Sequence, residues 1–288
     1  MKTSVRLIHT GYFYADGGCM FGATPQSAWK RRYKADAQNR CRLAMHVGLV
    51  TTRCGRVILI DNGIGSKHTD RLKTSFYQFH ELTDLDKALR QYGIRPEDVT
   101  DVVLTHLHFD HCGGTTRYGG NEQIIPAYPN ATCWVSEAQW HEAFHPNALE
   151  RDSFFPENME IIHASGKLRL VEEETWLTPE VRLRLFGGHT CGQIVVDVRT
   201  DSLTVVFAGD VIPTSAHLSP TWISAYDIRP LETYHAKIRL LEEAAANEQI
   251  IVYYHDAYIP CSAVKKINDF YKAIPCAMNT DSRSEASE

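Results

Sequence analysis

The sequence has no long apolar run and no close pair of cysteines, and each absence excludes a class of protein. No stretch approaches the ~20 consecutive apolar residues that a membrane-spanning helix needs. Among the eight cysteines the closest two, Cys41 and Cys54, are thirteen positions apart, which excludes CxxC knuckles and dithiol redox motifs. Residues 1–10 lack the apolar core of a signal peptide. We therefore expect a cytoplasmic protein without a membrane anchor, with mostly free thiols.

A surplus of charge of one sign is also absent. Thirty Lys and Arg residues against 35 Asp and Glu residues give a net charge of −5, so there is no basic field to favour nucleic acid as a partner. Hydrophobic residues make up 43% and charged residues 23%, which is ordinary globular usage. Because no low-complexity linker divides the chain, we predict one domain over residues 1–278, followed by a disordered polar tail over 279–288.

Short apolar runs alternate with helical patterns along the chain. The runs predict strands, and most end at Asp, Gly or His: 56–60, 102–104, 181–185, 194–198, 203–207 and 250–254. Apolar residues at helical spacing, together with capping residues, predict helices over 82–92, 136–144 and 230–246. Residues 199–202 between two of the strands favour a hairpin. Strands that alternate with helices predict a layered α/β fold.

The densest chemical pattern lies directly after the predicted strand 102–104. His106, His108, Asp110 and His111 provide four potential metal ligands within six residues, and Gly113 and Gly114 follow. An extended or looping backbone can point His106 and His108 the same way, whereas the adjacent Asp110 and His111 point in different directions and could serve a second ion. Imidazole nitrogen and carboxylate oxygen both suit zinc. The segment therefore predicts a metal site.

Three further candidate ligands stand near the ends of later strands: His189, Asp210 and His255. Each alone could be an ordinary turn residue. With the dense segment they make seven ligand groups, which is enough for two cations bridged by one carboxylate.

These residues resemble the metal-binding motifs of the metallo-β-lactamase superfamily, in which H-x-H-x-D-H is followed by His, Asp and His. The resemblance implies an αββα sandwich. It also implies that His106, His108 and His189 hold one metal, that Asp110, His111 and His255 hold a second, and that Asp210 bridges them. Asp61, at the end of Leu-Ile-Asp-Asn-Gly, matches an aspartate that steadies the ligand loop in this family rather than binding metal.

The resemblance extends to one branch, that of quorum-quenching lactonase-like and methyl parathion hydrolase-like enzymes. The segments that carry it are 16–22, 60–65, 209–214 and 225–227. One departure concerns the substrate, because some acyl-homoserine lactonases have a tyrosine where this chain has Pro213. Tyr226 is the candidate replacement.

A centre of this kind predicts hydrolysis without a serine or cysteine nucleophile, and the sequence has no Gly-x-Ser-x-Gly motif. Two divalent ions, expected to be Zn²⁺, can lower the pKa of a bridging water to near neutrality and so supply the hydroxide that attacks the substrate. We expect Asp110 and Asp210 to be catalytic. Aromatic and apolar residues in the matching segments are candidates for the substrate pocket, although each could equally be core: Met20, Phe21, Phe109, His217, Trp222 and Tyr226.

The expected substrate is a small ester, foremost a lactone such as an N-acyl-homoserine lactone. Organophosphate triester cleavage is the main alternative. A thioesterase and a catalytically silent metal-binding protein are less favoured, and a diiron electron-transfer protein would usually have a carboxylate in place of His108. Apolar segments near the amino terminus allow a homodimer.

Overall fold

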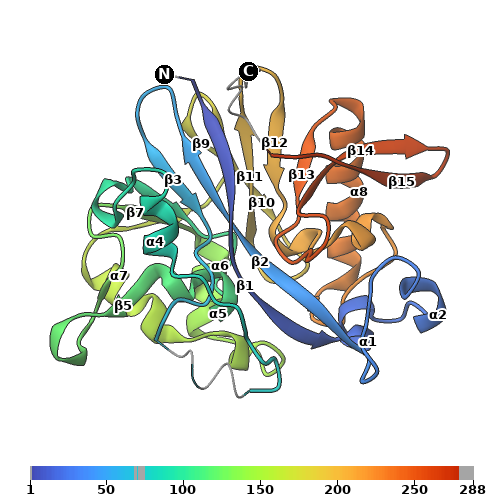
Figure 1. The fold of residues 1–288 in the computed structure, drawn as a ribbon, viewed down its shortest axis with the longest axis horizontal. Coiled ribbons are helices and arrows are strands. Elements are labelled where there is room, and N and C mark those ends of the chain that lie inside the picture. Colours follow the sequence, from blue (N-terminus) through green and yellow to red (C-terminus); the bar gives the residue numbers. More distant parts are fainter. Residues whose placement is uncertain (1, 68–69, 71–74, 279–288) are drawn as a thin grey trace, which may run out of the picture.

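The computed structural model describes residues 2–67, 70 and 75–278, and its two largest sheets pack face to face (Figure 1). The first sheet contains, in spatial order, β1 (Ser4–Asp16), β2 (Arg40–Thr51), β3 (Val57–Ile60), β4 (Asp101–Val103), β7 (Thr132–Ser136) and β8 (Leu168–Val171). The second contains β15 (Phe270–Pro275), β14 (Cys261–Ile267), β13 (Ile250–Val252), β12 (Thr204–Phe207), β11 (Gln193–Arg199), β10 (Val181–Phe186) and β9 (Thr175–Thr178). A separate ribbon pairs β5 (Thr116–Tyr118) with β6 (Ile124–Pro126).

Helices cover the outer faces of both sheets. The α-helices are α1 (Gly17–Phe21), α2 (Gln26–Trp29), α4 (Leu85–Arg90), α5 (Phe109–Cys112), α6 (Glu137–Phe144), α7 (Glu160–Ala164) and α8 (Pro230–Ala246). Short 3₁₀ turns join them: η1 (Pro96–Asp98), η2 (Gly113–Thr115), η3 (Gly120–Glu122), η4 (Arg151–Ser153), η5 (Pro156–Asn158), η6 (Gly209–Val211) and η7 (Ser215–Leu218). Helices α4, α6 and α7 pack on the first sheet and α8 packs on the second, which confirms the predicted layered α/β fold.

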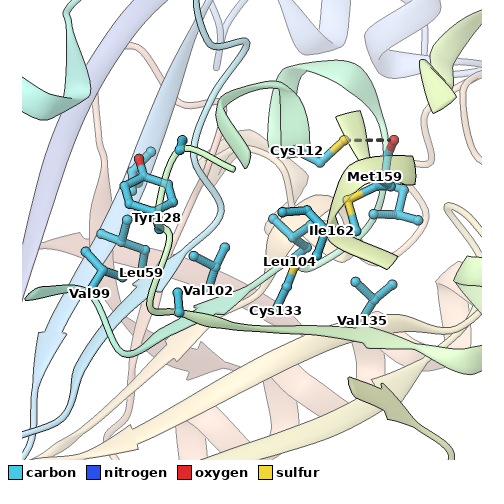
Figure 2. Packing of buried hydrophobic residues seen from close by; sticks show 14 of the residues in the cluster. Leu59, Val99, Val102, Leu104, Cys112, Tyr128, Cys133, Val135, Met159 and Ile162 are labelled. Atoms are coloured by element: carbon cyan, nitrogen blue, oxygen red, sulfur yellow. Dashed lines mark hydrogen bonds between the residues drawn. The ribbon is translucent and has the colours of Figure 1, made fainter. Parts of the chain in front are cut away.

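The strands near the middle of each sheet are apolar on both faces because each face is covered. In β3, Leu59 packs toward the helices, whereas Ile58 and Ile60 pack toward the second sheet. Figure 2 shows the helix side of this sheet, where Leu59 and Val102 lie in the same cluster as Ile162 of α7. Alternation to opposite faces, with both faces buried, explains why these strands appear in the sequence as unbroken apolar runs.

The predicted elements are found, with shifts at some ends. Helix α6 begins after Ser136, whose hydroxyl oxygen accepts a hydrogen bond of 3.0 Å from Gln139 N. Helix α4 begins at Leu85 rather than at residue 82, because the side chain of Asp84 caps its first turn. The two long strands β1 and β2 were not predicted; a bulge between His9 and Gly11 interrupts the register of their pairing.

In the part of the chain that the structure describes, no helix is both long and apolar enough to cross a membrane. The predicted tail, 279–288, lies outside the described residues. The extent of the single domain stays a prediction.

Candidate metal centre

Two loops meet at the end of β3 and β4, and close backbone contact fixes them together. Asp61 ends β3 with a left-handed backbone (φ 57°), a conformation that Asp tolerates better than most residues. A Cβ atom on Gly65 would lie 2.4 Å from Gly113 O, and one on Gly113 would lie 2.3 Å from Ile64 O. The glycines after the histidine-rich segment are therefore required by packing, since any side chain would separate the two loops.

The carboxylate of Asp61 organises the histidine-rich loop. Its Oδ1 accepts a hydrogen bond of 2.7 Å from Thr105 N, and its Oδ2 accepts one of 2.8 Å from Thr105 Oγ1. His111 Nδ1 lies 2.9 Å from the same Oδ2. This contact orients the ring so that its Nε2 faces inward. The structure thus places Asp61 where the resemblance expects it, behind a candidate ligand.

Each of the other four histidines has a comparable outer partner. His189 Nδ1 lies 2.8 Å from Asp227 Oδ1, and His255 Nδ1 lies 2.9 Å from the carbonyl oxygen of Ala44. Two contacts are longer and involve His106 Nδ1 with Thr105 Oγ1 (3.1 Å) and His108 Nε2 with Glu150 Oε1 (3.4 Å). One nitrogen of every ring therefore has a partner away from the centre, and the other faces inward.

The inward nitrogen atoms crowd together. His108 Nδ1 lies 3.0 Å from His106 Nε2 and 3.2 Å from His189 Nε2, and His111 Nε2 lies 3.2 Å from His255 Nε2. Rings that keep their protons on the outer nitrogens have only lone pairs to present here. Lone pairs that converge in this way fit a bound cation.

Asp210 lies between the two groups of histidines. Its Oδ2 is 3.4 Å from His189 Nε2 and 3.3 Å from His255 Nε2, and its Oδ1 is 3.5 Å from His111 Nε2. Oδ1 is buried, and within the described part of the chain it accepts no hydrogen bond. Asp110 Oδ2 lies 3.6 Å from His255 Nε2. A buried carboxylate oxygen without a donor also fits a cation.

Three sets of these side chains have ligand atoms within 4.8 Å of one another and could each hold a metal ion: His106, His108 and His189; His106, His111 and Asp210; Asp110, His111 and His255. The structure thus brings together all seven residues that the sequence suggested as ligands.

Burial and mutual charge set the protonation of this cluster. Burial lowers the pKa of His106 well below its usual value, and the neighbouring His111 and His108 lower it further. Burial also opposes the charged form of His111, but the carboxylates of Asp210 and Asp110 raise its pKa well above the ordinary value. Burial would raise the pKa of Asp210, yet His255 and His111 hold it well below the usual range. The carboxylate of Asp210 is thus ionised and attracts positive charge.

A cavity of about 250 Å³ opens onto this cluster and is lined by five of the seven candidate ligands: His108, Asp110, His189, Asp210 and His255. Its remaining wall is mostly apolar and aromatic, with Phe13, Ala15, Met20, Leu43, Tyr77, Phe109, Leu149, Pro213, Tyr226 and Ile228. Ser153, Ser224, Glu150 and Asp227 add polar groups. Small-molecule sites have this mixture of apolar walls and few polar groups.

Three of the six predicted pocket residues line the cavity, namely Met20, Phe109 and Tyr226. The other three, Phe21, His217 and Trp222, are not among its lining residues and form a packed aromatic group. The Phe21 ring stacks on His217 at a centroid distance of 4.7 Å, and Trp222 meets Phe21 edge-on at 5.8 Å. Both ring nitrogens of His217 have partners, since Nε2 lies 2.8 Å from Met20 O and Nδ1 lies 2.7 Å from Thr214 Oγ1. The ring therefore supports the wall of the cavity from behind.

The sequence analysis missed several residues of the site. Glu150 and Asp227 each contact a candidate ligand histidine, and Glu142 Oε2 accepts hydrogen bonds from Thr190 Oγ1 (3.0 Å) and Cys191 N (2.7 Å) beside His189. No local pattern marks Glu142 or Glu150. Asp227 stands in the segment 225–227, which carried the family resemblance without revealing this contact.

The family model of the metallo-beta-lactamase superfamily matches residues 44–255, nearly three quarters of the chain. The chain belongs to that superfamily and is a metal-dependent hydrolase of its kind. It is 25% identical, over 195 residues, to the N-acyl homoserine lactonase AiiB of Agrobacterium fabrum; the match covers 66% of this chain and 68% of that protein.

Among solved structures, a probable metal-dependent hydrolase from Staphylococcus aureus superposes with a TM-score of 0.83 at 28% identity, covering 96% of this chain and 98% of that one. AidC, a dizinc quorum-quenching lactonase, superposes with a TM-score of 0.76 at 20% identity, covering 96% of this chain and 95% of its own. The αββα metallo-β-lactamase architecture predicted from the motif is thereby confirmed.

Proposed function

We propose that this protein is a dinuclear, zinc-dependent hydrolase that opens small lactones, with N-acyl-homoserine lactones as the foremost candidates. The observation that carries the proposal is the convergence of seven inward-facing His and Asp side chains at the base of an apolar cavity. The similarity to N-acyl homoserine lactonases supports the choice of substrate.

In this proposal His106, His108 and His189 hold one ion, and Asp110, His111 and His255 hold the other. Two of the three ligand sets found in the structure coincide with these groups. Asp210 bridges them, since its two oxygens face histidines of both sets. Bound divalent ions would supply Lewis acidity, which lowers the pKa of water and polarises a carbonyl oxygen.

The surrounding residues then have distinct tasks. Asp61, Asp227 and the carbonyl of Ala44 fix the orientation of His111, His189 and His255, so that the centre is preorganised before substrate enters. The carboxylate of Asp110 lines the cavity, where it could take the proton released by the attacking water and pass it to the leaving alkoxide of the opened ring.

The apolar wall suits an acyl chain. Phe109 and Met20 line it, and Tyr77 and Tyr226 share a hydrogen bond between their side chains. Tyr226, whose hydroxyl group takes part in that bond, thus belongs to the cavity wall, and Pro213 stands at the position of the lactonase tyrosine. We propose that this hydroxyl positions the substrate.

The aromatic rings favour a second candidate, cleavage of aryl phosphotriesters. Tyr77, Phe109 and Tyr226 all line the cavity, and Phe109 stacks on Phe155 at 5.0 Å. Flat aromatic walls suit an aryl leaving group as well as they suit an acyl chain. Cytoplasmic location, a homodimer and the absence of a nucleic-acid partner stay predictions.

The decisive experiment follows proton release during ring opening of a long-chain N-acyl-homoserine lactone by the zinc-loaded protein, with metal content measured in parallel. We expect turnover in the wild type and background rates in His108→Ala. The matched control is His235→Ala, which removes an exposed histidine on α8 and should leave turnover unchanged.

The His108→Ala variant tests the catalytic centre, and the wild type tests the substrate. Full activity of His108→Ala with two ions bound would reject the catalytic centre. An inactive wild type with two ions bound would reject the lactone substrate and move aryl phosphotriesters to the front.

A further inference from the structure

Two cysteines outside the metal centre lie directly opposite each other on neighbouring strands. Cys261 begins β14, and Cys276 follows the last residue of β15. The two strands are antiparallel and pair Ser262 with Pro275, so the next position on each side brings the cysteines together. Their sulfur atoms are 3.7 Å apart, and Cys261 Sγ also lies 3.2 Å from the carbonyl oxygen of Cys276.

We propose that Cys261 and Cys276 form a thiol–disulfide site, which closes into a cross-strand disulfide when the protein meets a small oxidised disulfide such as oxidised glutathione. Directly opposed residues of an antiparallel pair have Cβ atoms about 4.5–5.5 Å apart, and a disulfide needs about 3.5–4.5 Å. The sulfur atoms already face each other, so the bond forms with a small approach of the two strands and no change of register.

The two thiols differ in access, and this difference sets the order of the steps. Cys276 is partly exposed, whereas Cys261 is 1% exposed and packs among the residues between the two sheets. Burial, together with a smaller effect of the neighbouring Cys276, raises the pKa of the Cys261 thiol to about 12. Cys276 is thus the thiol that meets the oxidant, and Cys261 reacts second.

The chemistry balances with the named oxidant. The thiolate of Cys276 attacks one sulfur of oxidised glutathione, which forms a mixed disulfide and releases one glutathione thiolate. The sulfur of Cys261 then attacks Cys276 Sγ and breaks its bond to glutathione, and the proton of Cys261 passes to the departing glutathione thiolate. In sum two protein thiols are oxidised to one disulfide, and one oxidised glutathione is reduced to two glutathione thiols.

Closure would tie down the last strand of the second sheet. β15 lies at the edge of that sheet and is held by its pairing with β14, and β14 in turn pairs with β13. A covalent ring over residues 261–276 restricts the unfolded chain and so stabilises the hairpin. The site is independent of the proposed hydrolysis, since none of its atoms lines the metal-centre cavity.

The test uses the whole protein, treated with excess oxidised glutathione, then denatured, alkylated and digested with trypsin without reduction. We expect the tryptic peptides 240–265 and 273–283 to appear joined, with a mass about 2 Da below the sum of the two thiol peptides, because two hydrogens are lost. The melting temperature of the oxidised protein should rise by a few degrees and return after reduction.

Variants separate this site from other thiols. Cys276→Ala should lose both the joined peptide and the thermal shift, while Cys54→Ala, which removes an exposed cysteine elsewhere, should keep both. The wild-type digest alone can overturn the proposal: alkyl groups on both Cys261 and Cys276 would do so. A stable glutathione adduct on Cys276 without the joined peptide would also overturn it, because the second step would then be absent.

Discussion

At the scale of single residues, Asp61 shows how much of the site depends on a side chain that binds no metal in our proposal. Its two oxygens accept from Thr105 N and Oγ1 and face His111 Nδ1. In Asp61→Asn one oxygen becomes an NH₂ group, which must face a donor. We expect zinc affinity to fall by about 10–100-fold, the usual effect of losing such a partner. Competition with a chromophoric chelator measures it.

A matched control is Asp84→Asn, which changes a helix-capping carboxylate on α4 that does not contact the histidines. It should leave zinc affinity unchanged. Equal affinity of the Asp61→Asn variant and the wild type would show that the histidine loop holds its shape without the carboxylate.

The candidate ligands were predictable from the dense histidine-rich segment and its later companions, but their supporting partners were not. His106, His108, Asp110 and His111 fall within six positions, and spacing alone makes them conspicuous. Glu150 lies 42 positions from His108, and Asp227 lies 38 positions from His189. A carboxylate so far away in sequence is indistinguishable from a solvated one until the fold brings it to the ring.

At the scale of the element, helix α8 contains a lysine whose charge opposes folding. Lys237 is 1% exposed, and its Nζ donates to the carbonyl oxygens of Trp222 (2.6 Å) and Ser219 (3.1 Å). Burial lowers its pKa from 10.5 to about 7, which Asp227 partly offsets. Between these values the unfolded chain binds more protons than the folded protein, so this lysine makes stability rise with pH.

We therefore expect the unfolding free energy of the wild type, relative to Lys237→Met, to grow by ~2 kcal/mol from pH 7 to pH 9. Urea unfolding at three pH values measures the difference. Lys272→Met, at an exposed position on β15, is the control. A difference that stays constant or shrinks over this range would show that Lys237 remains charged in the folded protein.

A glycine of β2 lets the two sheets approach. A Cβ atom on Gly48 would lie 2.5 Å from the ring of Phe207 in β12. Gly48→Ala should therefore destabilise the protein by about 1–3 kcal/mol through overpacking. Chemical denaturation measures the loss, and Gly120→Ala, where a Cβ meets nothing within 4 Å, is the control. If both variants unfold at the same denaturant concentration, the sheets have room to separate at Gly48.

The strands at 56–60, 203–207 and 250–254 were predictable from their apolar runs, whereas β1 and the largely buried β2 were not. Residues 57–60, 205–207 and 250–254 within these runs are apolar because helices cover one face of each strand and the other sheet covers the second. β1 mixes half-buried and buried positions, and its bulge between His9 and Gly11 breaks the alternation that would mark a strand. Pairing with β2, which the local sequence pattern does not reveal, stabilises β1 as a strand.

At the scale of the whole molecule, the metal centre joins the two sheets. The histidine-rich loop follows β4 of the first sheet, whereas His189, Asp210 and His255 follow β10, β12 and β13 of the second. Ions held by both sets bind the folded chain and not the unfolded one. At a free zinc concentration ~1,000 times the dissociation constant this contributes ~4 kcal/mol.

Removal of metal by a chelator should therefore lower the melting temperature by ~10 °C, and zinc should restore it. Calorimetry with parallel metal analysis measures this. In His108→Ala the shift should be smaller because one set of ligands is incomplete. An unchanged melting temperature in protein proven free of metal would show that ligand convergence does not depend on ions.

The burial of the candidate ligands also determines how metal ions and substrate reach them. His106 and His111 are 0% exposed, whereas the other five candidate ligands line the cavity that would admit substrate. Within the described chain, we therefore expect ions and substrate to reach these ligands through the same cavity. We therefore expect a molecule bound in the cavity to obstruct the departure of a metal ion behind it, so that metal loss is slower during turnover than in the resting protein.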